Sequence, residues 1–320
     1  MIGMLQRAGA RFAAFFDDDP AIAVQVAERY DGVTLAASRQ HILDDPKIAL
    51  VVGTPPHDER AALGIDAMRH GKDYLCAKPG FTTHSQLEVA ETVAAQSGRR
   101  YLAYFGERLQ NRSTVKALEL VQSGRIGRVV QTVGFGPHKL GQSARPDWFY
   151  RTDRYGGILN DLACHQIDQF LLFTGSPTAE IAAAHIGNVN MPDVPSFQDV
   201  GDVTLRAAGA TGYIRVDWLT PTGLPTWGDV RLFVTGTGGM IELRKNIDLD
   251  GRDGTDHLLV VDAHGVERIL CDDVDLPFGR QLIADILERT ETAMTQTHCF
   301  EVCRLSLDAQ AKALWIGAQE

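Results

Sequence analysis

The stretch Ile48–Gly53, which reads IALVVG, decides the fold class. It is a continuous apolar run, the pattern of a strand that is buried on both faces of a parallel sheet. The tetrapeptide Thr54-Pro55-Pro56-His57 follows it directly, and a helical pattern then runs to His70 and closes at Gly71. A buried strand that leads into a helix in this way predicts an α/β domain.

Strand and helix patterns alternate on both sides of this run. Further strands are predicted at 11–16, 33–36, 73–76 and 100–105, and further helices at 21–30 and 83–96. The later strand-like runs are separated by Gly and Asp clusters, and they cover 128–135, 179–189, 202–207, 213–219, 230–235, 240–244, 258–262 and 266–270. The remaining helices are predicted at 2–7, 113–122, 280–292 and 300–316. The sequence therefore predicts a Rossmann-type parallel sheet in residues 1–107, followed by an α+β domain with a large, mostly antiparallel open sheet in residues 108–320.

Composition narrows the class of protein. Hydrophobic residues make up 44% and charged residues 22% of the chain, and the net charge is -10. This acidic balance argues against a nucleic-acid partner or a basic membrane-binding face, and no apolar run is long enough to span a bilayer. The five cysteines are odd in number and show no CxxC spacing. We therefore expect reduced thiols and a cytoplasmic protein.

The chain opens in a predicted helix that closes at Gly9, and no GxGxxG precedes it. A dinucleotide-binding half begins with a strand, a glycine loop and a helix, and its first strand is central in the sheet. A missing central strand would leave buried backbone groups unpaired, at on the order of 1–3 kcal/mol each. We therefore expect about 15–25 upstream residues that supply this strand and loop. The alternative is a chain that has lost the loop and no longer binds a dinucleotide.

The most informative chemical motif is the segment 156–168, GGILNDLACHQID. Asp161 and His165 are four residues apart, so a helix places them one turn apart on one face. A carboxylate beside an imidazole suits proton transfer near neutral pH. The alternative is a pair of satisfied core groups. Asp168 adds a third group to this face, but no further Cys or His lies nearby in sequence, so a metal site is not predicted.

Three loops follow predicted parallel strands, at the carboxyl edge where such sheets bind ligands. Asp17 ends the strand 11–16, where an acid accepts hydrogen bonds from ribose hydroxyls and favours NAD over NADP. Thr54, Pro55, Pro56 and His57 form a stiff wall against which a nicotinamide could lie. Lys78, in Ala77-Lys78-Pro79, could lie close to the cofactor, and its charge could lower the pKa of a nearby His or substrate hydroxyl. The alternatives are a solvated turn, an ordinary strand-to-helix loop and a surface lysine.

Together these motifs resemble the Gfo/Idh/MocA oxidoreductase family, over nearly the whole chain. The resemblance also includes Gly236-Thr237-Gly238-Gly239 before the strand 240–243. It implies a Rossmann domain, an α+β domain on a large open sheet, and hydride transfer between NAD(P) and sugars, inositols or related polyols. One departure is clear: the family has Glu-Lys-Pro where this chain has Ala77-Lys78-Pro79.

The resemblance also implies roles for the catalytic residues. His165 is expected to be the general base that takes the substrate hydroxyl proton, and Asp161 to orient its imidazole and bind a substrate hydroxyl. Lys78 is expected to hydrogen-bond the reacting oxygen. From the residues themselves, we name as candidate substrate contacts the polar and aromatic side chains Arg145, Trp148, Arg151 and Trp227.

Two other functions stay open. Some relatives use tightly held NAD to oxidise a sugar transiently and then eliminate its glycosidic substituent. A non-catalytic dinucleotide- or sugar-binding regulatory protein is the third class, favoured by the lost glutamate and the missing glycine loop. For any of them, an open sheet with one face free of helices would expose much apolar surface. We therefore expect a homodimer or homotetramer through that face.

Overall fold

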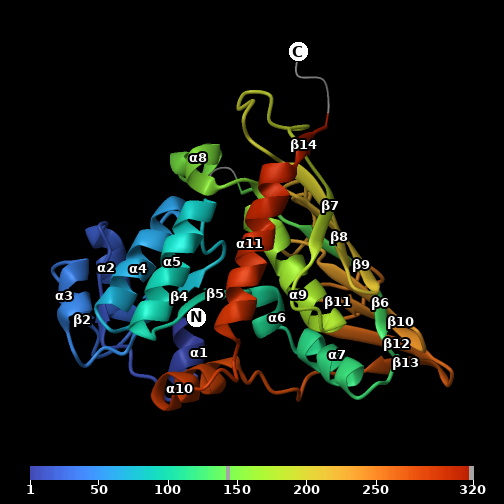
Figure 1. Ribbon diagram of the computed structural model, residues 1–320, viewed down its shortest axis with the longest axis horizontal. Coiled ribbons are helices and arrows are strands. Elements are labelled where there is room, and N and C mark those ends of the chain that lie inside the picture. Colours follow the sequence, from blue (N-terminus) through green and yellow to red (C-terminus); the bar gives the residue numbers. More distant parts are fainter. Residues whose placement is uncertain (142–144, 317–320) are drawn as a thin grey trace.

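The N-terminal part of the chain is a Rossmann-like α/β unit in the computed structural model, which describes residues 1–141 and 145–316 (Figure 1). Its strands all pair in parallel, and they are β1 (Ala14–Phe15), β2 (Thr34–Leu35), β3 (Leu50–Gly53), β4 (Asp73–Ala77) and β5 (Tyr101–Tyr104). The helices between them are α1 (Ile2–Arg7), α2 (Pro20–Arg29), α3 (Arg39–Asp44), α4 (Arg60–Arg69) and α5 (His84–Ser97). The predicted alternation of strand and helix is confirmed.

One expectation about this unit is wrong: the run Ile48–Gly53 is not buried on both faces. Only β4 and β5 are buried along their length, whereas β3 alternates between buried and half-buried residues. The strands form two groups, β1-β2 and β3-β4-β5, so β3 is an edge strand among the described residues. Because successive side chains of a strand point to opposite faces, one face of β3 is less covered than the other.

The C-terminal part of the chain is built on one mixed sheet. Its strand order is β13-β12-β11-β10-β6-β9-β8-β7-β14, in which β6 runs parallel to β9 and β14 to β7, and the other neighbours are antiparallel. The strands are β6 (Val129–Pro137), β7 (Glu180–Gly187), β8 (Val200–Ala207), β9 (Ala210–Asp217), β10 (Arg231–Gly236), β11 (Gly239–Arg244), β12 (His257–Asp262), β13 (Gly265–Ile269) and β14 (Leu314–Trp315). The large, mostly antiparallel open sheet is confirmed.

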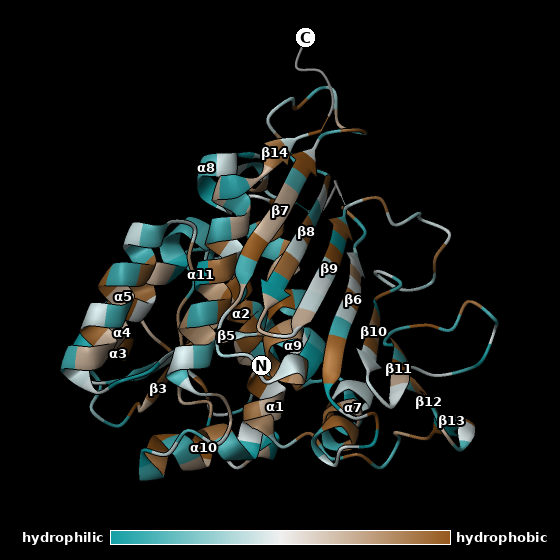
Figure 2. Ribbon diagram, turned by 45° about the vertical axis from the view of Figure 1, so that its right-hand side comes forward, coloured by the Kyte–Doolittle hydropathy of each residue, from teal (hydrophilic) through white to brown (hydrophobic). Residues whose placement is uncertain are grey.

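Helices cover one face of this sheet and link it to the Rossmann-like unit (Figure 1). Against the sheet lie α7 (Arg112–Gln122), α9 (Cys164–Thr174) and α11 (Gln296–Lys312). The helix α11 also packs on α5 and β5, so it bridges the two units. Figure 2 shows the other face of the sheet at β6, β7, β8 and β9. None of the described helices lies over this face. The shorter helices are α6 (Gly106–Leu109), α8 (Thr152–Tyr155) and α10 (Phe278–Glu288).

Two predicted helices end earlier than expected. The predicted helix 280–292 ends at Glu288, because Arg289 adopts the left-handed conformation with φ 59° and turns its guanidinium to Asp73. The predicted helix 300–316 begins earlier, at Gln296, and ends at Lys312, after which Leu314–Trp315 pair with β7 as β14. Both ends depend on long-range contacts that no local pattern encodes.

Candidate active site

The loops after β3 and β4 are held together by Arg60, at the start of α4. Its guanidinium donates to the carbonyl oxygen of Pro55 at 3.0 Å, of Ala77 at 3.2 Å and of Pro79 at 3.1 Å, and also to that of Lys78. Arg60 is buried, so these carbonyls replace water around its charge. The sequence analysis missed this residue. Its position three residues after the Pro-Pro-His loop was the available signal.

Lys78 contacts the segment 156–168 directly. Its Nζ lies 2.8 Å from Oδ1 of Asp161 and 2.9 Å from the Asp161 carbonyl oxygen. Asp161 is buried, and burial alone would raise the pKa of its carboxyl. The nearby charge of Lys78, with smaller contributions from His57 and His138, outweighs burial and lowers this pKa to about 2. Two groups that are 83 residues apart therefore form one buried ion pair.

The segment carrying Asp161 differs from a regular helix. Residues Leu159–Ala163 form a π-helical turn, η4, and α9 begins only at Cys164. Two left-handed glycines precede it, and a Cβ on Gly157 would lie 2.2 Å from the side chain of Gln310. Only glycine fits this approach between the turn and α11. A π-turn of this kind is frequent at functional sites.

His165 lies on the first turn of α9 and is buried. Burial, then the charge of Lys78, lowers its pKa well below the ordinary value, so the imidazole is neutral at pH 7. Among the described residues its Nδ1 has no hydrogen-bond partner, and no hydrogen bond joins it to Asp161. The expected orientation of the imidazole by Asp161 is therefore not seen, because that carboxylate binds Lys78 instead.

Two further histidines lie within electrostatic range of Asp161, and one of them was expected. His57, in the Pro-Pro-His loop, is buried, and its Nδ1 lies 2.9 Å from the carbonyl oxygen of Tyr155. Its ring meets the ring of Trp148 edge-on at 5.0 Å. Burial is the main reason that the pKa of His57 falls to about 4. Trp148 is thereby placed beside the loop after β3, which Arg60 ties to the loop that carries Lys78.

His138, just after β6, is the second of these histidines. Burial lowers its pKa to about 3, assisted by the charge of Lys78. Its ring lies 4.5 Å from the ring of Trp227 and 5.5 Å from that of Trp218. Arg145 lies over the Trp218 ring, with 4.9 Å between its Cζ and the ring centre. Of the candidate substrate residues, Arg145, Trp148 and Trp227 thus belong to one aromatic cluster around the site.

Three of the candidate residues lie outside this cluster or are exposed to solvent: Arg151, Asp17 and Thr54. Arg151 is exposed and forms an ion pair with Asp153 at 2.7 Å. Asp17 follows β1, and its Oδ1 accepts a hydrogen bond from the backbone N–H of Asp19 at 2.9 Å. Asp19 caps α2, and Thr54 is exposed. None of the contacts of Asp17 connects it to Lys78, and its position at the end of β1 is the one expected for a ribose contact.

A buried polar network lies behind His165, between α9 and α6. Gln166 Nε2 donates to Glu107 Oε2 at 2.7 Å, and Lys245 Nζ lies 3.6 Å from the same oxygen. Lys245 also donates to the side chain of Gln169, which in turn donates to the His165 carbonyl oxygen at 2.7 Å. Burial raises the pKa of Glu107 and lowers that of Lys245. The sequence analysis missed both residues, because neither lies in a recognisable motif.

Asp168, on α9, is bound by two side chains from other segments of the chain. Arg108 binds both of its oxygens, at 2.7 and 2.9 Å, and His298 Nε2 lies 2.7 Å from one of them. Burial would raise the pKa of Asp168, but these partners hold it well below its usual range. No cluster of three His, Cys, Asp or Glu side chains suited to a metal ion occurs in residues 1–141 and 145–316. No helix in these ranges is both long and apolar enough to cross a membrane.

Comparison with known proteins identifies the two units. Residues 3–105 match the "Oxidoreductase family, NAD-binding Rossmann fold" and residues 114–242 the "GFO/IDH/MocA C-terminal domain". A crystal structure from Erwinia carotovora atroseptica, named only as that of an oxidoreductase, is 41% identical with a TM-score of 0.96, and the match covers 99% of this chain and 95% of that one.

More distant relatives have named activities. Levoglucosan dehydrogenase of Pseudarthrobacter phenanthrenivorans is 23% identical over 78% of this chain and 61% of its own length. Inositol 2-dehydrogenase 2 of Saccharopolyspora erythraea is 27% identical over 76% of this chain and 68% of its own. A structure of levoglucosan dehydrogenase with NADH and levoglucosan has the same fold, with a TM-score of 0.75 at 19% identity over 94% of this chain and 87% of that one.

The first curated relatives are longer than the parts that match: the chain spans between 42% and 61% of their length. The two family matches nevertheless cover most of the sequence, and the fold agrees with them throughout. The chain belongs to the Gfo/Idh/MocA family of oxidoreductases, with an NAD-binding Rossmann domain joined to the family's C-terminal domain.

Proposed function

We propose that the protein is an NAD-dependent dehydrogenase that oxidises a hydroxyl group of a sugar, an inositol or a related polyol. The observation that carries this proposal is the Lys78–Asp161 ion pair after the carboxyl end of β4, with the neutral, buried His165 within reach of the charge of Lys78. The named activities of levoglucosan dehydrogenase and inositol 2-dehydrogenase 2 support the substrate class.

The residues present fit a dinucleotide at this edge. The loops after β3 and β4 are fixed by Arg60, and the Pro-Pro-His loop offers an apolar wall next to Lys78. The nicotinamide would supply the hydride acceptor. We propose NAD rather than NADP, because the carboxylate of Asp17 at the end of β1 would repel a 2′-phosphate.

The side chains then have distinct tasks. The ammonium of Lys78 is paired with Asp161 and can donate to the reacting oxygen, which stabilises negative charge there. The neutral imidazole of His165 can accept the hydroxyl proton. The aromatic cluster of Trp148 and Trp227, with Arg145, would exclude water and hold the sugar ring. All five cysteines are free thiols, which supports a cytoplasmic location.

The test is NADH formation on a panel of sugars and polyols, with parent protein and the His165→Asn variant. We expect His165→Asn to lower kcat by about 10²–10⁴-fold with nearly unchanged NAD affinity. A parent that cleaves glycosides without net NADH would replace the proposal with the transient-oxidation mechanism. Retained NAD affinity without any turnover would favour a regulatory binding protein.

A further inference from the structure

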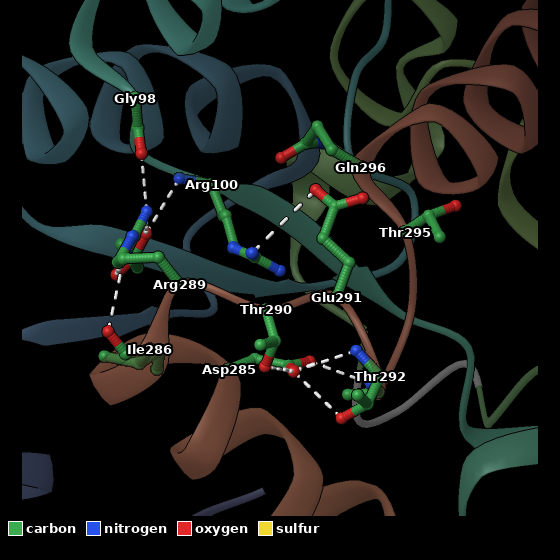
Figure 3. Close-up of polar contacts among 12 residues, drawn as sticks. Gly98, Arg100, Asp285, Ile286, Arg289, Thr290, Glu291, Thr292, Thr295 and Gln296 are labelled. Atoms are coloured by element: carbon green, nitrogen blue, oxygen red, sulfur yellow. Dashed lines mark hydrogen bonds and ion pairs between the residues drawn. The ribbon is translucent and has the colours of Figure 1, made fainter.

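A cavity lies far from Lys78, at the amino ends of β4 and β5. Its volume is about 560 Å³, and it lies between the end of α5, the start of α11 and the turn that joins α10 to α11. Figure 3 shows Arg100, Arg289, Glu291 and Gln296 gathered from these segments. Because the parallel strands place Lys78 at their carboxyl ends, this cavity belongs to the other edge of the sheet.

Four arginines line the cavity, but two of them already form ion pairs with carboxylates of the protein. Arg289 binds both oxygens of buried Asp73, at 2.7 and 3.2 Å, and also the Gly98 carbonyl oxygen. Arg304 forms ion pairs with Glu91 and Glu301. These contacts fix the walls of the cavity and neutralise both guanidinium groups. The remaining arginines are Arg99 and Arg100.

Arg100 is the feature that points to a ligand. It is only 6% exposed, and its Nη1 has no hydrogen-bond partner among the described residues. The nearest carboxylate oxygen, on Glu291, lies 3.9 Å from Nη2, too far for a hydrogen bond. A buried guanidinium normally has its N–H groups satisfied by acceptors, and Nη1 of Arg100 is free to donate to a further oxygen.

The surroundings suit an anion. The helix α11 begins at Gln296, and Thr297 on its first turn lines the cavity, so the positive end of the helix dipole faces it. The turn before it is rigid: buried Asp285 accepts hydrogen bonds from Thr290, Thr292 and Ala293 (Figure 3). Donors that are fixed before binding lose little freedom when a ligand arrives.

The carboxylate of Glu291 lies near Arg100, where such an anion would bind, but it is weakly held. Its side chain is 43% exposed, and Arg100 is its only ion-pair partner in the described part of the chain. A ligand oxyanion that reaches Arg100 would displace this carboxylate toward solvent, at little loss because a solvent-exposed carboxylate 3.9 Å from its partner makes a weak pair. Glu291 is therefore an internal competitor for the site.

We propose that this cavity is a binding site for a small organic oxyanion, held by Arg100 with Arg99 and the amino end of α11. The charged group would be a phosphate or a carboxylate, and the volume leaves room for the organic part. The site is separate from the proposed dehydrogenase centre and does not depend on it.

The test is calorimetric titration of the full chain with inorganic phosphate and, separately, with malonate, at constant ionic strength set by chloride. We expect millimolar or tighter binding of at least one of them. The Glu291→Gln variant should bind about fivefold more tightly, because it loses the competing charge. The Arg100→Gln variant should lose binding.

Gained affinity in Glu291→Gln cannot arise from misfolding, so this variant keeps the test decisive if Arg100→Gln folds poorly. The matched control is Glu288→Gln, a change of the same charge at the end of α10 that does not line the cavity. Phosphate binding without malonate binding would identify a phosphate ester, and the reverse a carboxylate. Absence of binding by parent and Glu291→Gln, or equal gains in both glutamate variants, would overturn the proposal.

Discussion

Lys78 and Asp161 depend on each other because neither charge is stable alone in a buried site. The sequence motifs predicted that both would be functional, and the structure brings them within 2.8 Å. The motifs could not show that Asp161 binds Lys78 rather than His165. That choice follows from the π-turn Leu159–Ala163 and from the loop that carries Lys78, and residue spacing along a regular helix contains neither.

The pKa of Asp161 predicts a dependence of stability on pH. Because the folded pKa is about 2, below the ordinary value of 3.8 for an aspartate, the ionised carboxyl stabilises the fold above about pH 4. This contribution, roughly 2 kcal/mol, should disappear as the pH falls from about 4 to 2. Urea unfolding should therefore show Asp161→Asn less stable than the parent at pH 6, with a smaller difference near pH 3. An equal difference at both pH values would contradict a lowered pKa.

Arg60 is a second residue with a separable role. We expect Arg60→Met to leave the carbonyl groups of two loops unsatisfied, with a loss of about 3–5 kcal/mol in the free energy of unfolding. The KM for NAD should also rise, because these loops form the proposed cofactor wall. Arg60→Lys keeps the charge but offers fewer donors, so it should be intermediate in both measurements. Unchanged KM values would restrict Arg60 to a structural role.

At the scale of elements, α9 is fastened to α6 by the pairs Glu107–Gln166 and Arg108–Asp168. Sequence patterns predicted most helices and strands, because apolar periodicity and turn residues are local. They did not predict β14, the early end of α10 or the partial burial of β3. Those features are decided by which distant segment lies alongside, as with Arg289 and Asp73.

The buried pair Glu107–Lys245 should adjust the pKa of His165, which burial and the charge of Lys78 mainly lower. Lys245, together with Lys78 and His138, lowers the pKa of His165, and Asp168 opposes them. Lys245→Met should therefore raise that pKa and move the acid limb of the pH profile of kcat/KM upward. Glu107→Gln leaves Lys245 without its counter-charge and should move the limb downward.

The double variant Glu107→Gln/Lys245→Met is the matched control. It removes both charges, so its profile should lie between those of the single variants. Histidine NMR titration, with His165→Asn for assignment, measures the same shifts without substrate. Profiles that move in the same direction in both single variants would indicate a general loss of packing.

On the scale of the whole molecule, the sheet has one face without a covering helix in the described part of the chain (Figure 2). Phe135 and Phe233 meet on neighbouring strands of this face, with ring centres 6.1 Å apart, and the guanidinium of Arg215 lies over Phe135. An apolar patch with a charged margin is typical of a subunit interface. We propose that two or four copies associate through it.

Light scattering after size-exclusion chromatography tests this assembly. We expect a dimer or a tetramer for the parent, and a smaller species for Phe233→Glu, because a carboxylate at the centre of the interface would be desolvated. Val266→Glu, on exposed β13 at the margin, is the control and should keep the parent mass. A parent that elutes as a monomer at micromolar concentration would contradict the proposal.

The contact between Lys78 and Asp161 joins the Rossmann-like unit to the segment between β6 and β7 of the large sheet. A chimera that combined this N-terminal unit with a relative's C-terminal domain lacking the aspartate would bury an ammonium without a counter-ion. The reverse exchange would strand a carboxylate in an apolar interior. Recombination between family members is therefore constrained by the Lys78–Asp161 ion pair. A chimera must either keep both residues or replace both.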